Sequence, residues 1–174
     1  MGATTTQGTG PGSVSNIKPL VVNGSVMADN VAPSDKSVVV TDSTVTLTKS
    51  AHAGKVVVLA RAAGVTVTLP AALGNGDVYT IVVGTTVTSN ADVIKVANTN
   101  DSLVGRAIAT TDATTTNNIW MPSSGDDTIT LNGGTKGGYV GDYIQLIDVD
   151  GNSFLVNAFL KQTATEATPF SATV

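Results

Sequence analysis

Short segments that alternate apolar and polar residues follow one another from about residue 37 onward, separated by clusters of Gly, Pro, Asn and Asp. The alternation is most regular at 44–48 and 65–69, where valine and leucine occupy one set of positions and threonine the other. A period of two predicts strands that are buried on one face, and no segment holds a sustained helical period. We expect strands at residues 37–41, 44–48, 55–60, 65–69, 78–83, 93–97, 103–109, 118–121, 128–131, 143–149 and 153–159.

Two of these segments contain continuous apolar runs. Residues 55–59 read Lys-Val-Val-Val-Leu, and residues 81–83 read Ile-Val-Val. Such runs are typical of strands that are covered on both faces or that carry an interface, and the second alternative implies oligomerisation. Turn residues support the strand boundaries, since Pro70 closes one strand and residues 74–77 reverse the chain. Residues 150–152, Asp-Gly-Asn, are expected to join the last two strands as a hairpin.

The composition is typical of an all-β chain. Thr, Val and Ile make up 60 of the 174 residues, whereas glutamate occurs once, as Glu166. β-branched residues favour strands, and these strands recur at the spacing of a sandwich or barrel. We therefore predict a single β-sandwich, jelly-roll-like, or a barrel, with the strand order undecided. Alternation alone explains the likeness of the Thr/Val segments near residues 45 and 67, so no internal repeat is predicted.

The first 34 residues differ from the rest of the chain. They are rich in Gly, Thr, Ser and Asn, and their charged residues are Lys18 and Asp29. Such a composition is typical of an arm and not of a core. We predict an extended N-terminal arm over residues 1–34 and a β-sandwich domain over residues 35–174.

The arm holds two short apolar segments that could add strands to a neighbouring sheet. These are residues 18–22 and 25–27, with Asn23-Gly24 as the turn between them and residues 30–34 as a linker to the domain. The arm residues that we predict to contact another protein are Leu20, Val21, Val22, Val26 and Met27.

Charge and cysteine content exclude several partners. Only 13% of the residues are charged and the net charge is -4, so the chain lacks the basic patch that phosphate backbones require, and nucleic acid is not an expected partner. The absence of cysteine excludes disulfide scaffolds, zinc ribbons and thiol chemistry. No apolar run approaches the roughly 20 residues that cross a bilayer, and residues 1–6 lack the features of a secretory signal, so no membrane partner is expected.

Catalytic groups are difficult to assemble from this sequence. The single histidine, His52, lies among small residues in a predicted turn, and neither a cysteine nor a Gly-x-Ser-x-Gly nucleophile motif accompanies it. We interpret it as a turn histidine that makes one hydrogen bond. Asp126 and Asp127 could suggest a pair of catalytic carboxylates, but adjacent residues of an extended chain point to opposite faces. We predict no catalytic residues and no enzyme.

Three further patterns suggest ligand sites that we do not predict. Residues 148–152 echo the start of a calcium loop, yet Glu166 lies too far along the chain to complete it, and an Asp-Gly hairpin turn is favoured. The Gly-rich segment 132–138 lacks the order of a phosphate loop and is interpreted as a flexible connection. Trp120 is the one plausible seed of a sugar platform, and we interpret it as core or interface packing. No cofactor and no metal are predicted.

Six segments of the chain follow one another in a recognisable succession. They are Ser-Thr-Val-Thr-Leu-Thr at 43–48, Gly-Lys-Val-Val-Val-Leu at 54–59, Gly-Val-Thr-Val-Thr-Leu-Pro at 64–70, Gly-Asp-Val-Tyr-Thr-Ile-Val-Val at 76–83, Gly-Asp-Tyr-Ile-Gln-Leu at 141–146 and Asp-Gly-Asn-Ser-Phe-Leu-Val at 150–156. This succession resembles the head decoration (cement) proteins of tailed bacteriophages. The resemblance covers about residues 37–170 and leaves the arm outside it. Phe154 stands where such proteins often have Trp, which is a departure from their pattern.

The resemblance implies a compact β domain on the outer surface of the virion capsid, present as a homotrimer, with arms that reach between subunits of the major capsid protein. The implied function is structural, namely stabilisation of the phage head by bridging capsid subunits. Two alternatives stay open: a tail or head fibre or adaptor protein that contributes to host attachment, and a carbohydrate-binding module, which would require clustered aromatic residues.

Overall fold

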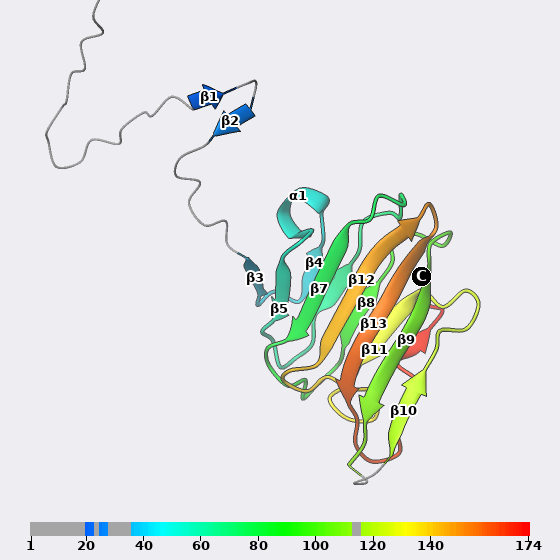
Figure 1. The fold of residues 1–174 in the computed structure, drawn as a ribbon. Coiled ribbons are helices and arrows are strands. Elements are labelled where there is room, and N and C mark those ends of the chain that lie inside the picture. Colours follow the sequence, from blue (N-terminus) through cyan, green and yellow to red (C-terminus); the bar gives the residue numbers. More distant parts are fainter. Residues whose placement is uncertain (1–19, 23–24, 28–35, 113–115) are drawn as a thin grey trace, which may run out of the picture. The chain divides into compact units, whose positions relative to one another are not determined.

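The computed structural model describes residues 20–22, 25–27, 36–112 and 116–174. The chain divides into two units, Met1–Ser34 and Asp35–Val174. In the larger unit nearly all regular structure is β, and its strands form two mixed sheets that pack together (Figure 1). The predicted all-β sandwich is therefore confirmed.

The larger sheet has seven strands in the order β10-β9-β13-β12-β7-β5-β3, and the smaller has five in the order β14-β11-β8-β6-β4. The strands of the larger sheet are β3 Ser37–Val40, β5 Val56–Leu59, β7 Val78–Val83, β9 Ser102–Thr110, β10 Asn117–Trp120, β12 Tyr143–Asp150 and β13 Ser153–Lys161. Those of the smaller are β4 Thr44–Thr46, β6 Thr66–Thr68, β8 Asp92–Lys95, β11 Thr128–Leu131 and β14 Phe170–Ser171.

The first half of the domain winds back and forth between the two sheets. Strands β3, β5 and β7 pair in parallel in one sheet, and β4, β6 and β8 pair in parallel in the other. The similar segments near residues 45 and 67 therefore occupy adjacent places, with Val45 of β4 opposite Val67 of β6. A jelly roll is built from antiparallel strands. The parallel pairing therefore excludes a jelly roll, and the domain is a sandwich of another strand order.

The second half closes the larger sheet around a long hairpin. Strands β12 and β13 pair antiparallel on either side of the turn at 151–152, which confirms the hairpin predicted there. Strand β12 continues antiparallel onto β7, while β13 lies parallel to β9. The hairpin thus joins the early parallel strands to the later ones in one continuous sheet (Figure 1).

The core lies between the two sheets and is filled by the inward faces of the alternating strands. On β7, for example, Tyr79, Ile81 and Val83 are buried, whereas the residues between them are partly exposed. Tyr79 meets Phe154 of β13 edge to face, with the ring centres 6.4 Å apart. Full burial of side chains of this size stabilises the fold by about 1.5 to 3 kcal/mol each.

One local expectation was wrong. His52 does not lie in a plain turn but ends a four-residue helix, α1 Lys49–His52, because the Thr48 side chain caps its first turn by accepting from Ala51 N–H. Two strand bounds also differ by one residue from the prediction, since β9 extends to Thr110 and β10 begins at Asn117. Cross-strand pairing with neighbours extends these two strands into polar residues that alternation alone does not assign.

The smaller unit contains two strands, β1 Leu20–Val22 and β2 Ser25–Met27, which pair antiparallel with Leu20 opposite Met27. The predicted turn at Asn23-Gly24 and the linker at 30–34 lie outside the described residues. The backbone of the five predicted contact residues forms these strands, and their contact with another protein stays a prediction.

Asp92 is a fully buried carboxyl at the start of β8. Its Oδ1 accepts a hydrogen bond from Val65 N–H at 2.8 Å, whereas Oδ2 has no hydrogen-bond partner among the described residues. Burial raises the pKa of Asp92 to about 6, and the hydrogen bond from Val65 offsets this only in part. The folded protein therefore holds the Asp92 proton up to a higher pH than the unfolded chain does.

Replacing Asp92 by asparagine is expected to remove the part of the pH dependence of stability that the Asp92 carboxyl contributes. Because the folded-state pKa lies above its ordinary value of 3.8, the folded wild type binds an extra proton between about pH 4 and pH 6. Its free energy of unfolding, relative to that of D92N, should fall by about 3 kcal/mol as the pH rises through this window. Urea unfolding of both proteins at several pH values measures this, and a difference that does not vary with pH would contradict it.

Candidate interaction surface

The outward face of the larger sheet carries an uninterrupted row of apolar side chains. The cross-strand register places one apolar residue from each strand in this row, which runs from one edge of the sheet to the other. Its ends are the most exposed, with Ile119 at 64% and Val39 at 61%, and Phe159 near the middle is 52% exposed. In order across the sheet, the apolar row consists of Val39, Val58, Val82, Tyr143, Phe159, Ile108 and Ile119.

The apolar row is long enough to contact another protein. Six strand spacings of about 4.8 Å give it a length of about 29 Å. At its centre the rings of Tyr143 and Phe159 lie 6.3 Å apart in a tilted arrangement. A second, shorter apolar row lies further along the strands and contains Val78, Ile147, Leu155 and Val104. Contiguous exposed apolar surfaces of this kind mark interaction sites.

This face excludes one of the two interpretations of the continuous apolar runs. On β5 and β7, inward residues are buried and outward residues such as Val58 and Val82 are half-buried, so neither strand is covered on both faces within the domain. One outward valine of each run, Val58 and Val82, belongs to the apolar row. The interpretation of these runs as part of an interface stays a prediction.

A polar strip separates the two apolar rows. It contains Gln145, Asn157 and Arg106, which lie opposite one another on β12, β13 and β9. None of these three side chains has a hydrogen bond or ion pair within the described part of the chain. They line a groove of about 410 Å³ whose walls include Ile108, Ile147 and Leu155.

The charge of this face differs in sign from that of the whole chain. Among the outward positions of the seven strands, the charged residues are Arg106, Lys161 and, beside the hairpin turn, Asp150. Lys161 lies over the ring of Tyr139, with Nζ 4.9 Å from the ring centre. Arg106 and Lys161 are cationic, so cations outnumber carboxylates on this face although the chain carries a net charge of -4. The face is therefore apolar, and it is locally basic around Arg106 and Lys161.

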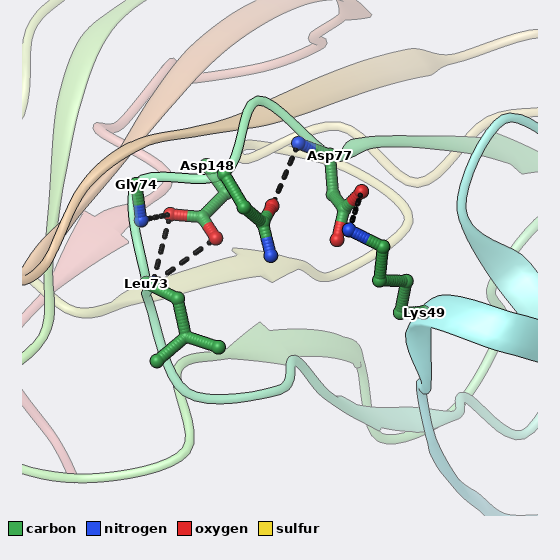
Figure 2. A network of polar contacts seen from close by, with 6 residues as sticks. Lys49, Leu73, Gly74, Asp77 and Asp148 are labelled. Atoms are coloured by element: carbon green, nitrogen blue, oxygen red, sulfur yellow. Dashed lines mark hydrogen bonds and ion pairs between the residues drawn. The ribbon is translucent and has the colours of Figure 1, made fainter.

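The acidic residues that suggested chemistry hold loops in place. Asp148, from the calcium-like segment, is buried, and its two carboxylate oxygens accept hydrogen bonds from Leu73 N–H and Gly74 N–H at 2.7 to 3.1 Å (Figure 2). Next to it, Asp77 pairs with Lys49 of α1 at 2.9 Å. Within the residues described, no group of three or more potential metal ligands occurs.

The Asp126-Asp127 pair is structural in the same way. Asp126 accepts a hydrogen bond from Ser123 N–H, which closes the preceding turn. Asp127 is buried and accepts from Thr173 N–H, from the Thr128 hydroxyl and from Val174 N–H. Although burial by itself raises the pKa of Asp127, these hydrogen bonds lower it overall. Asp127 therefore holds the C-terminal segment against β11, and Asp126 holds the turn before it.

The remaining candidates are also occupied by the fold. His52 Nδ1 accepts a hydrogen bond from Thr48 N–H at 2.9 Å. Trp120 packs against the core, as predicted, and its Nε1–H donates to Gln162 Oε1. The 132–138 segment is more ordered than predicted, since Asn132 Oδ1 accepts from Gly134 N–H and Lys136 N–H. The face of the larger sheet is thus the strongest candidate for a functional surface.

Comparison with protein-family models, curated proteins and solved structures found no match to this chain. Among the described residues, no helix has both the length and the apolar character needed to traverse a membrane.

Proposed function

We propose that this protein is a structural component of a virion, a capsid decoration protein that binds the outer surface of a phage head and stabilises it. The single observation that carries the proposal is the apolar row on the outward face of the larger sheet. A surface of this length fits a protein partner better than a small molecule. The resemblance of residues 37–170 to cement proteins indicates that the partner is the major capsid protein.

Stabilisation of a shell by such a protein would be mechanical. A domain that covers apolar surface on neighbouring subunits must be displaced before those subunits separate, so each bound copy adds free energy to the closed shell. The arm would contribute a second contact through strand addition, in which main-chain hydrogen bonds supply the affinity. In the homotrimer that the resemblance implies, three linked copies would bind with avidity.

The described side chains support a structural function better than a catalytic one. His52, Asp127 and Asp148 each make hydrogen bonds within the fold, and each is buried. A catalytic base needs access to a substrate proton, which these groups lack.

The copy number of the chain in purified particles from its source tests this proposal. Quantitative mass spectrometry relative to the major shell protein should give a ratio near parity. A ratio of only a few copies per particle would favour the fibre or adaptor alternative instead. Absence from the particles would overturn the virion assignment.

Removal of the arm, residues 1–34, is expected to lower the occupancy of particles at least severalfold, because strand addition by Leu20–Val22 and Ser25–Met27 would be lost. Occupancy is measured by mass spectrometry after incubation with particles that lack the protein. An unfolding curve of the shortened chain serves as the control for folding. Unchanged occupancy of a folded, shortened chain would contradict the assignment of the arm as a clamp.

The carbohydrate-binding alternative is favoured by one observation, the neighbouring rings of Tyr143 and Phe159 on an open sheet face. Rings of this kind stack on sugars. Binding to cell-surface glycans of the host by a protein that is absent from particles would support this second function.

A further inference from the structure

The geometry points to a specificity site within the interface: the groove at Arg106, Asn157 and Gln145 receives a carboxylate side chain of the capsid protein. This inference rests on the proposed function and adds the chemistry of the partner. The occupant is thus a protein surface that is apolar around an acidic residue.

The groove presents hydrogen-bond donors without partners. The Arg106 guanidinium carries five N–H donors in a planar fork that matches a carboxylate, and the amides of Asn157 and Gln145 add further donors. The three residues lie opposite one another on adjacent strands, so their side chains emerge about 4.8 Å apart. A carboxylate in the groove could therefore bind the guanidinium and an amide together.

The floor of the groove depends on a glycine. Gly105 of β9 has a φ of +110°, and a Cβ at this position would lie 2.2 Å from the Val156 carbonyl oxygen. Because only glycine tolerates this geometry, β9 approaches β13 closely and no side chain fills the space beside Arg106. The hollow is lined by Gly105, Arg106 and Asn157 among others.

The surroundings of the groove strengthen such an ion pair. The apolar row lies on one side and Ile147 and Leu155 lie on the other, so a partner that covers both rows would exclude water from the pair. Charge interactions become stronger when water is excluded, and they then discriminate between partners.

The charge of the face distinguishes a capsid partner from a second copy packed on the same face. The outward positions of the seven strands supply Arg106 and Lys161 and one carboxylate, Asp150, which lies opposite Ser153 at the end of β12 and accepts a hydrogen bond from Asn152 N–H. Two such faces packed together would therefore bring together more cations than carboxylates. An acidic partner satisfies the charges that a second copy of this face leaves unpaired.

Charge reversal at Arg106 tests the inference. R106E should bind particles that lack the protein at least tenfold more weakly than wild type. R106K keeps the positive charge but not the planar set of guanidinium donors, so it should lose less affinity than R106E does. The matched control is K95E, on the outward side of the smaller sheet, which should bind as wild type does. Binding is measured by cosedimentation of the full-length proteins with particles at two salt concentrations, and the wild type should be the more salt-sensitive protein.

The possible failures are distinguishable. If the wild type does not bind the particles, the proposed function fails, and this inference fails with it. If the wild type binds and R106E binds equally well, only the carboxylate site is overturned. If the molar mass of R106E in solution, measured by light scattering, differs from that of the wild type, the groove belongs to a contact between copies of this chain. That result also overturns the inference. Loss of binding with unchanged mass and unfolding curve is the result that we expect.

Discussion

Replacement of Asp142 by alanine should destabilise the domain by about 3 to 6 kcal/mol, a large part of the stability of a typical domain. The buried Asp142 carboxylate accepts hydrogen bonds from Gly138 N–H at 2.7 Å, Tyr139 N–H at 3.2 Å and Lys161 N–H at 2.8 Å. It thereby fastens the loop before β12 to the end of β13. Alanine would leave these three donors without a partner. A buried unsatisfied donor costs about 1 to 3 kcal/mol, and the bonds from Tyr139 and Lys161 are part-buried, so their loss lies toward the lower end of that range.

Urea unfolding of the purified variant measures this loss. The control is D150A, because Asp150 is exposed and accepts a single hydrogen bond from Asn152 N–H within the hairpin turn. D150A should change the free energy of unfolding by less than about 1 kcal/mol. Equal stabilities of D142A and D150A would refute the assignment of Asp142 as a structural clamp.

Replacement of Phe159 by aspartate should weaken binding to particles by at least about 100-fold. Phe159 lies near the centre of the apolar row and is 52% exposed in the free protein, so the variant can fold while its interface is altered. A carboxylate there would be desolvated on binding and would oppose the acidic partner that Arg106 is inferred to bind. Cosedimentation with particles that lack the protein measures the affinity.

The matched control for Phe159 is T46D, since Thr46 is an exposed strand residue on the outward side of the smaller sheet. T46D should bind particles with the affinity of the wild type. Both variants should unfold within about 1 kcal/mol of the wild type. Equal binding by F159D and the wild type would show that the apolar row does not contact the shell.

Alternation along the chain was enough to predict most of the strands but not their pairing. Strands β7 and β11 begin and end at the predicted residues. Thr44–Thr46 and Thr66–Thr68 would alternate in the same way in parallel and in antiparallel sheets, so the parallel order of β4 and β6 could not be predicted. The short β14 exists because β11 offers it an edge, which is a non-local cause.

The roles of the aspartates were hidden for a similar reason. Asp148 binds the backbone at Leu73 and Gly74, about 75 positions earlier in the chain, and a local motif cannot indicate such a contact. Asp92, which binds Val65 N–H, is a comparable case. Several of the few acidic residues are thus buried as loop clamps, which helps to explain why Asp150 is the one carboxylate at an outward strand position of the larger sheet.

The candidate surface had a partial signal in the sequence. The apolar runs at 55–59 and 81–83 raised the possibility of an interface, and one outward valine of each run, Val58 and Val82, lies in the apolar row. Phe159 and Leu155 were missed because they alternate with the inward residues of the same strand, so both faces of β13 are partly apolar. The groove at Arg106 depends on the register of three strands, which only the fold supplies.

The most direct test of the central claim, that this protein decorates a capsid through its larger sheet, is a cryo-electron microscopy reconstruction of particles from its source. The account predicts density for the domain on the outer surface of the shell, with the apolar row from Val39 to Ile119 against the capsid protein. Density in which the smaller sheet faces the shell and the larger sheet faces solvent would contradict the assigned surface. A shell that carries no such density would contradict the function itself.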